Sequence, residues 1–574
     1  MSDSSPAPGP SVPGPSVPGP SVPGPSVPGP SILGPSVPGS PTPGPSTPGP
    51  STPGPSTPGP STPGPSTPGP PTPGPFIPFT PAPLADLVDG LGAPCPSIPG
   101  PPREIPVTGE ELDALRGSTD ARLEAALDAA DRVHRGGDWA GRPDAERADL
   151  LDAAAAAVDR RAHDITRAEA FGSGVPVAQT GLLGVILGGA FRLAAARLRA
   201  SVLHADAVRP DGRRVTVRRE ALGPALCVVP YNAPAPMAAH KAASALAAGC
   251  PVLVKAPELN PYGTQLLVET AAAALAEAGA PPAVLQLLHG DGATGARLVA
   301  DDRVRAVSFT GGTPAGREVA AACGHALKPA QLELGGNNAL VVMADADTDT
   351  AARIAVDLLT TLNGQWCRAL GRLVVPAGRT GELLEAIGAS LSALRTGDPL
   401  DPATGYGPLA HSRHRGAALA ATRTLTGLGA KEHSRTPLPE RGNWLAPTLI
   451  TGAPEERARA EIFGPVATVH PYEHLDEAVH LANATGYGLE AYVTGTDEDA
   501  ALAVAARVRA GEVKVNGSSV LSLHQDTPRP AWGASGLVDE GTDETLLHFT
   551  GTRVTGVENG FALHLPAPAE GDTP

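Results

Sequence analysis

The chain has 574 residues, of which 41% are hydrophobic, and it carries a formal net charge of −16. This length allows two or three domains with a large buried core. The acidic balance, without a basic stripe, argues against binding to DNA or RNA. The five cysteines form no CxxC pair, which suits neither a disulfide framework nor a zinc site. We therefore expect a reducing, cytoplasmic compartment and no bound metal.

The N-terminal region is a repeat. Residues 9–78 repeat a five-residue unit, which reads Gly-Pro-Ser-Val-Pro at first and Gly-Pro-Ser-Thr-Pro later. A period of five excludes collagen, which needs glycine at every third position. The proline and glycine content predicts a disordered, partly polyproline-II spacer, continued by a linker through residue 105. The repeat is either a docking site for an unknown partner or an inert expansion.

The sequence gives no sign of membrane association. The chain opens without the positively charged, apolar segment of a secretory signal. The longest apolar stretch, around residues 182–191, is too short to span a bilayer.

A folded region is predicted from residue 106 onward. Helices are expected over residues 110–115, 120–134 and 145–171, the last with apolar residues at helical spacing. The Asp-Gly pair at 211–212 predicts a hairpin over residues 202–219. Strands over 225–229, 252–255, 284–288 and 306–309 then alternate with helices over 237–248, 264–278 and 293–300. That alternation predicts a parallel, doubly wound α/β sheet.

We divide the folded region into two α/β domains. Residues 106–334 are expected to form the first. Residues 335–524 are expected to form the second, with strands near 339–343, 372–375 and 512–516. Residues 525–557 return to the first domain and end in an extended arm over 546–557. Residues 558–574 are expected to be a flexible tail.

Two residues carry the expected chemistry. Cys367 follows Gln365-Trp366, and Glu333 lies in the run Leu-Glu-Leu-Gly-Gly. A cysteine thiolate is the strongest nucleophile among the standard side chains. A carboxylate held beside it can act as general base in a second, hydrolytic step. The alternative for a single cysteine is a small buried hydrophobe.

Three segments could contact a nucleotide. The run from Gly290 to Gly295 matches GxGxxG and includes Gly292, but no acidic residue ends the next strand, so an ordinary tight turn is the alternative. Lys255 and Glu258 end a predicted strand and could contact ribose hydroxyls. The small residues between Phe309 and Gly316 would let the backbone approach a diphosphate.

These residues occur together in a known superfamily. Over residues 106–557 the chain resembles the NAD(P)-dependent aldehyde dehydrogenases. The shared motifs stand in the same order: Pro230-Tyr231-Asn232-Ala233-Pro234, Lys255 with Glu258, Phe309 to Gly316, Leu332-Glu333-Leu334-Gly335-Gly336, Gln365-Trp366-Cys367, Glu461-Ile462-Phe463-Gly464-Pro465 and Pro530 to Gly536.

The resemblance implies oxidation of an aldehyde to its acid. Cys367 would attack the aldehyde, Asn232 would stabilise the oxyanion, and Glu333 would activate the water that hydrolyses the thioester. NAD would accept the hydride, with NADP possible. Residues 106–334 would then be the NAD-binding domain and residues 335–524 the catalytic domain. The expected cofactor contacts are Lys255, Glu258, Gly292, Phe309, Thr310, Gly311, Gly312, Gly316, Leu334, Glu461 and Phe463. The hairpin and the arm resemble oligomerisation elements, so we expect a homodimer or homotetramer.

Other functions stay open at this point. A coenzyme A-acylating relative would share Cys367 but would need no Glu333. A scaffold would use the proline-rich repeat and leave the enzyme fold passive. A cysteine protease would share little beyond Gln365 and Cys367. The sequence does not identify the aldehyde.

Overall fold

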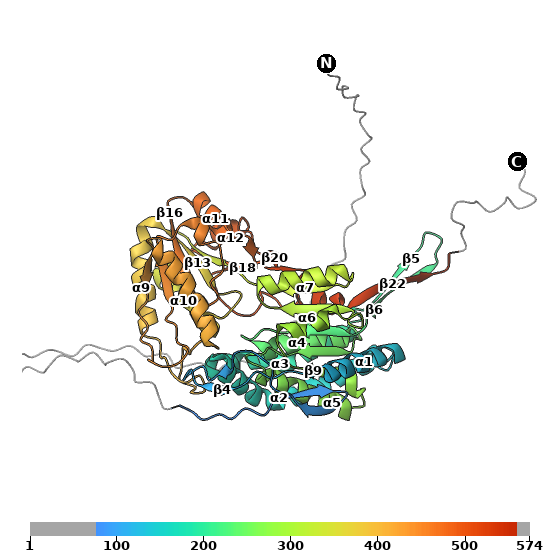
Figure 1. Ribbon diagram of the computed structural model, residues 1–574. Coiled ribbons are helices and arrows are strands. Elements are labelled where there is room, and N and C mark those ends of the chain that lie inside the picture. Colours follow the sequence, from blue (N-terminus) through green and yellow to red (C-terminus); the bar gives the residue numbers. More distant parts are fainter. Residues whose placement is uncertain (1–75, 559–574) are drawn as a thin grey trace, which may run out of the picture. The chain divides into compact units, whose positions relative to one another are not determined.

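The computed structural model describes residues 76–558. These residues, drawn as the coloured ribbon in Figure 1, belong to one of the two units into which the chain divides, the one that begins at Pro68. Nearly all of the repeat and the tail from residue 559 lie outside the described residues, and the predictions for them stay predictions.

The first sheet has eight strands in the order β2-β1-β9-β8-β7-β10-β11-β21. The five central strands, from β9 to β11, are parallel, and the strands at both edges are antiparallel. The strands are β1 (Ala85–Val88), β2 (Leu91–Pro94), β7 (Ala225–Val228), β8 (Val252–Lys255), β9 (Leu285–Leu288), β10 (Ala306–Thr310), β11 (Ala330–Glu333) and β21 (Gly536–Leu537).

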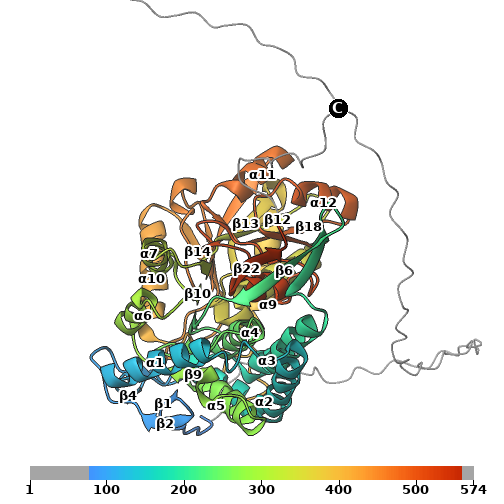
Figure 2. The ribbon, with the colours of Figure 1, turned by 90° about the vertical axis from the view of Figure 1, so that its right-hand side faces the viewer.

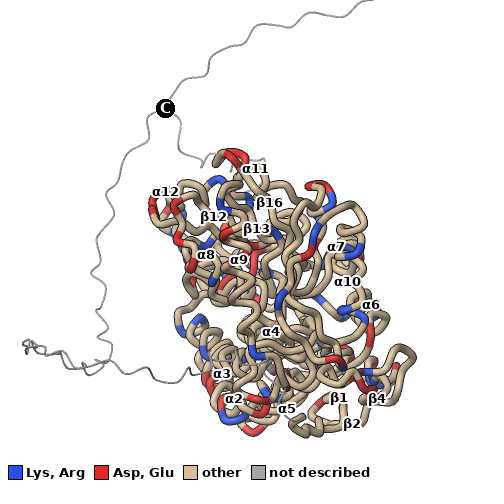
Figure 3. The backbone as a smooth tube through the Cα atoms, turned by 90° about the vertical axis from the view of Figure 1, so that its left-hand side faces the viewer, with Lys and Arg blue, Asp and Glu red and all other residues tan. Residues whose placement is uncertain are grey.

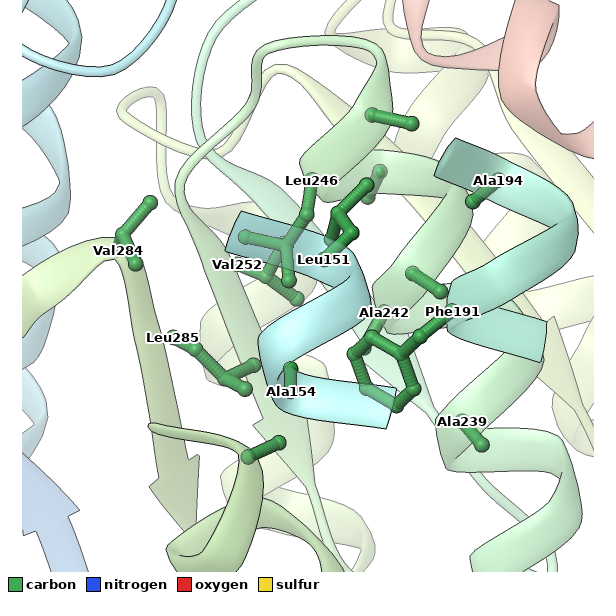
Figure 4. Packing of buried hydrophobic residues seen from close by; sticks show 14 of the residues in the cluster. Leu151, Ala154, Phe191, Ala194, Ala239, Ala242, Leu246, Val252, Val284 and Leu285 are labelled. Atoms are coloured by element: carbon green, nitrogen blue, oxygen red, sulfur yellow. The ribbon is translucent and has the colours of Figure 1, made fainter. Parts of the chain in front are cut away.

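Helices cover both faces of this sheet. On one face α2, α3, α4 and α5 share a buried apolar cluster with the strands, and Figure 4 shows ten labelled side chains of this cluster meeting between helices and strands. On the other face α1, α6 and α7 form a second cluster. The helices are α1 (Asp120–Gly136), α2 (Asp144–Ser173), α3 (Val177–Arg199), α4 (Pro234–Ala247), α5 (Tyr262–Glu277), α6 (Gly292–Ala300) and α7 (Thr313–His325). The predicted doubly wound α/β fold is confirmed.

The second sheet has seven strands in the order β14-β15-β16-β13-β12-β18-β19, and all except the edge strand β14 are parallel. Its faces are covered by α8 and α9 on one side and by α11 and α12 on the other. The elements are β12 (Asn338–Val342), α8 (Thr348–Thr360), β13 (Leu370–Pro376), α9 (Thr380–Ser392), α10 (Ser412–Gly427), β14 (Lys431–His433), β15 (Thr448–Thr451), β16 (Val466–Tyr472), α11 (Leu475–Asn483), β18 (Glu490–Thr494), α12 (Glu498–Ala505) and β19 (Glu512–Val515).

A three-stranded sheet joins distant parts of the chain. Strands β5 (His204–Val208) and β6 (Arg214–Ala221) form the predicted hairpin, and β22 (Thr550–Gly556) pairs with β6 (Figure 2). The predicted arm over 546–557 is only partly extended, because α13 (Thr542–His548) includes its first three residues. Leu546 is buried in the first core cluster, and this burial holds the helix against the domain.

Two predictions near the start of the folded region are wrong. Residues 110–115 are not helical: β4 (Glu111–Asp113) pairs there with β3 (Arg103–Glu104). Gly109 adopts a left-handed φ of 72°, and Arg103 Nε donates to Asp113 Oδ1 at 2.8 Å across the pair. The predicted linker also ends earlier than residue 105, because β1 and β2 add to the first sheet and Val88 is buried.

Helix α3 is longer than the apolar stretch at 182–191 suggested. Its 23 residues are long and apolar enough to cross a membrane, by length and composition only. Leu187, Phe191 and Leu198 lie in the first core cluster, as expected for a core helix of a folded domain.

Charges of both signs are dispersed along the tube in Figure 3.

Candidate active site

The predicted catalytic residues meet at one edge of the first sheet. Glu333 ends β11, Thr310 ends β10, and Asn232 lies four residues after β7. Because parallel strands place their carboxyl ends at the same edge, these residues converge, as in other open α/β sheets. The second domain contributes Cys367, which lies between α8 and β13.

Most of the predicted site residues line one cavity of about 410 Å³. The predicted residues that line it are Asn232, Thr310, Gly311, Gly312, Glu333, Leu334, Cys367, Glu461 and Phe463. The predicted residues that do not line it are Lys255, Glu258, Gly292, Phe309 and Gly316. All five cysteines are free, and Cys367 is partly exposed while the other four are buried. Cys367 is thus the cysteine that a substrate can reach.

A strained turn presents Cys367. The short helix η2 (Thr361–Gly364) contains Leu362 and Asn363, whose φ angles are 50° and 57°. Residues other than glycine rarely adopt this left-handed backbone conformation. The Asn363 Nδ2 donates to the carbonyls of Gly174 at 2.8 Å and Pro408 at 2.9 Å. These buried bonds hold the turn in place, and such strain is typical of functional sites.

Asn232 faces the same turn. Its Nδ2 donates to the Gln365 carbonyl at 2.8 Å, two residues before Cys367. An amide nitrogen carries two N–H donors, so one fixes the orientation of the group and the second can bind another acceptor. This arrangement can stabilise negative charge on an oxygen that forms beside Cys367.

The electrostatics of the site favour proton-bound forms of both reactive groups. Burial raises the pKa of Glu333, and the charge of Glu540 raises it further. Burial also raises the pKa of Cys367, and the Glu333 carboxylate adds to this effect by its charge and by a hydrogen bond between the two side chains. Glu333 and Cys367 line the same cavity, and a negative charge on Glu333 opposes formation of the Cys367 thiolate.

Buried charges around Cys367 were not expected from the sequence. Arg368 Nη1 lies 2.5 Å from Glu490 Oε2, and Lys514 Nζ lies 2.6 Å from the other oxygen of that carboxylate. Lys241 Nζ lies 2.6 Å from Glu540 Oε1 and is fully buried. Arg368, Glu540 and Arg529 line the cavity. The sequence does contain one clue to Lys241. It is a lone cation in an alanine-rich, buried-looking helix, and a lysine is rarely buried without a carboxylate partner.

The remaining predicted contacts surround the start of α7. The N-cap residue Gly312 offers no side-chain cap, so backbone N–H groups at this helix end stay available to an anion. A Cβ on Gly316 would lie 2.3 Å from Leu334 Cδ2, so a larger residue there would force the Leu334 side chain to move. Glu461 Oε1 accepts from the Gly336 N–H at 2.9 Å, and burial raises the pKa of Glu461 to about 7.

Two predicted cofactor segments lie away from the cavity lining. Lys255 Nζ is 3.5 Å from Glu258 Oε2, and burial lowers the pKa of Lys255. At Gly292 the helix start is already capped, because Asp291 Oδ1 accepts from the Thr294 N–H at 3.1 Å. A carboxylate at that position would repel a phosphate, so the structure favours the tight turn there.

Comparison with known proteins agrees with this site. A sequence model of the aldehyde dehydrogenase family matches residues 102–555. Geranial dehydrogenase of Castellaniella defragrans is 37% identical, over 69% of this chain and 83% of its own length. Betaine aldehyde dehydrogenase 2 of Rhizobium meliloti is 34% identical, over 72% and 85%. The chain belongs to the aldehyde dehydrogenase family.

Solved structures are similar over nearly their whole length. The NAD-dependent aldehyde dehydrogenase of Sinorhizobium meliloti is 28% identical, with a TM-score of 0.78, over 85% of this chain and 97% of that one. A mutant of aldehyde dehydrogenase C of Pseudomonas syringae, solved with NAD+ and octanal, is 27% identical with a TM-score of 0.75, over 82% and 96%.

Proposed function

We propose that this protein oxidises an aldehyde to its carboxylic acid, with NAD as hydride acceptor and Cys367 as nucleophile. One observation carries the proposal: a partly exposed Cys367 and a buried Glu333 line the same cavity, with the amide of Asn232 beside them. Solved relatives bound to NAD+ support the choice of cofactor.

The residues around the cavity fit a dinucleotide. The uncapped start of α7 and the Gly311-Gly312 backbone can take a diphosphate. Glu461 lines the cavity and can accept hydrogen bonds from ribose hydroxyls. The bound nicotinamide would supply the hydride acceptor, which no side chain of the protein can replace.

The first chemical step belongs to Cys367. Its thiol gives up its proton to solvent, and the sulfur, as a thiolate, then attacks the aldehyde carbon. The Cys367 N–H and the free N–H of Asn232 donate to the oxyanion. Loss of hydride from the carbon then leaves an acyl group on the sulfur as a thioester.

The second step belongs to Glu333. As a carboxylate it accepts a proton from water, and the water oxygen attacks the thioester carbon and releases the acid. Because burial raises the pKa of Glu333, this carboxylate is a stronger base than one in water. A buried base also favours hydrolysis over transfer to coenzyme A. A rate that depends on added coenzyme A would support the acylating alternative instead.

The proposal is tested by reduction of NAD in the presence of an aldehyde panel. Cys367→Ala should abolish the reaction. Cys323→Ala is the matched control, because Cys323 is buried in α7 and has no role in the chemistry. Equal activity of Cys367→Ala and the unmodified chain would refute the nucleophile.

We propose NAD rather than NADP because Glu258 would repel a 2′-phosphate. Lys255 lies 3.5 Å and Arg413 4.0 Å from that carboxylate, so both cations already face Glu258. Glu258→Gln should raise kcat/KM for NADP more than for NAD. If the ratio of kcat/KM for NADP to kcat/KM for NAD did not change, Glu258 would not contact the ribose.

We also propose a homodimer or homotetramer in the cytoplasm. In the three-stranded sheet β5 and β22 are edges, and all five residues of β5 are exposed. Exposed edge strands favour pairing with another chain. Light scattering that shows a monomer would contradict this assembly.

A further inference from the structure

Within the part of the chain that the structure describes, one cation in the catalytic cavity has no ion-pair partner. Arg529 lines the same cavity as Cys367. Its Nε is buried and, within residues 76–558, has no hydrogen-bond partner. Arg529 as a whole is half-buried, and an arginine stays charged in proteins, so this side chain brings a positive charge to the cavity.

The carboxylates near Arg529 are already paired with other cations. Glu540 lies 2.6 Å from Lys241, and Glu490 lies 2.5 Å from Arg368. Glu512 lies 3.4 Å from the same Arg368, and Lys514 is a third cation, 2.6 Å from Glu490 and 3.8 Å from Glu512. The charge of Arg529 therefore remains available to a ligand.

Backbone hydrogen bonds fix the position of Arg529. Its N–H donates to the Glu540 carbonyl at 2.6 Å, and its own carbonyl accepts from the Glu540 N–H at 3.2 Å. Arg529 and Cys367 line the same cavity, and the charge of Arg529 lowers the pKa of Cys367 against the larger effects of burial and of Glu333. A guanidinium that lines the cavity can form charge-assisted hydrogen bonds with an anionic group.

Apolar side chains also line the cavity that contains Cys367. They come from α3, α4, the turn at residues 361–366 and the segment after β19: Leu183, Ile186, Met237, Leu362, Trp366 and Val520. In such surroundings a wholly apolar aldehyde would leave the guanidinium unpaired, and a cationic aldehyde would meet like charge. A substrate with one anionic group would satisfy it.

We propose that Arg529 selects aldehydes that carry an anionic group, a carboxylate above all, and binds that group while Cys367 attacks the aldehyde carbon. This inference rests on the proposed function and adds the substrate class. The apolar walls would contact the carbon chain between the aldehyde and the carboxylate.

The test compares an acid with its neutral ester. We would measure kcat/KM with saturating NAD for 4-oxobutanoate, for its methyl ester, and for a series of ω-oxo acids of increasing length. The unmodified chain should prefer an oxo acid to its ester. Arg529→Gln should lower kcat/KM for the acid by about 10- to 150-fold, the equivalent of about 1.5–3 kcal/mol for a charged hydrogen bond, and leave the ester unchanged. Arg529→Lys should restore part of the loss.

Arg423→Gln is the matched control, because Arg423 is exposed on α10. It should change neither substrate. Equal losses for acid and ester in Arg529→Gln would overturn the proposal and give Arg529 a role in supporting Cys367. A preference of the unmodified chain for the ester would overturn it without any variant. A chain that oxidises neither acids nor neutral aldehydes would instead refute the proposed function.

Binding provides a readout separate from turnover. Trp366 lines the cavity, so tryptophan fluorescence of Cys367→Ala can follow titration with succinate and with neutral dimethyl succinate. The dianion should bind more tightly, and Arg529→Gln should remove the difference. Equal binding of both compounds to Cys367→Ala would contradict the proposed recognition.

Discussion

Arg368 provides the sharpest test of the charge network behind Cys367. It shares Glu490 and Glu512 with Lys514, at distances of 2.5, 3.4, 2.6 and 3.8 Å, and all four side chains are buried. Arg368→Met leaves two carboxylates with one cation. Breaking a buried pair in this way costs about 3–5 kcal/mol.

The expected change in melting temperature follows from the size of the protein. An unfolding entropy of about 2.1 cal/mol/K per residue gives roughly 1 kcal/mol/K for roughly 480 residues. Arg368→Met should therefore lower Tm by about 3–5 °C at a fixed scan rate. The double variant Arg368→Met with Glu490→Gln removes one charge of each sign, so its Tm should fall less than that of Arg368→Met alone.

The control is an exposed ion pair. Arg435 Nη1 and Nη2 each lie 2.6 Å from an oxygen of Glu385, but both side chains are largely exposed. Arg435→Met should lower Tm by about 1 °C or less, since exposed pairs contribute about 0–1 kcal/mol. Differential scanning fluorimetry measures Tm for the unmodified chain and all three variants. Equal losses for Arg368→Met and Arg435→Met, or a double variant worse than Arg368→Met, would refute the reasoning.

Three further predictions concern the site and the core. Asn232→Ala should lower kcat by about 100- to 1,000-fold at unchanged Tm, and a loss confined to KM would argue against an oxyanion role. Glu333→Gln removes a negative charge beside Cys367, so it should lower the pKa of the thiol and speed its alkylation by iodoacetamide at neutral pH; slower alkylation would mean that Glu333 promotes the thiolate. Burial raises the pKa of Glu169 to about 8 in the folded chain. The folded state therefore holds this proton more tightly than the unfolded state, and the resulting stabilisation is complete below about pH 4.5 and is lost as pH rises toward 8. Glu169→Gln keeps an oxygen to accept from the Ala235 N–H, so Tm should fall less between pH 5 and about 8 than in the unmodified chain, and an unchanged slope would contradict the shift.

Local patterns predicted the parallel strands because those strands are short apolar runs between helices. The Asp-Gly turn located the hairpin for a similarly local reason. Residues 110–115 were mispredicted because their conformation depends on a tertiary pair, Arg103 with Asp113, and on the left-handed Gly109. Helix α13 was missed because its residues fold against a distant core rather than by their own periodicity.

The structure places Asn232, Glu333 and Cys367 in the lining of one cavity, as their motifs suggested. Their catalytic roles stay predictions. Arg529 carried no comparable signal. Its meaning depends on which carboxylates surround it and which of those already have a partner, and both are properties of contacts across the fold.

The central claim is a covalent acyl group on Cys367. Glu333→Gln should slow hydrolysis, so the thioester should accumulate when this variant is mixed with NAD and an aldehyde substrate. Intact-protein and peptide mass spectrometry of the acid-quenched reaction should then show the mass of the acyl group on the peptide that contains Cys367. An unmodified Cys367 during active NAD reduction, or an adduct on another residue, would contradict the account.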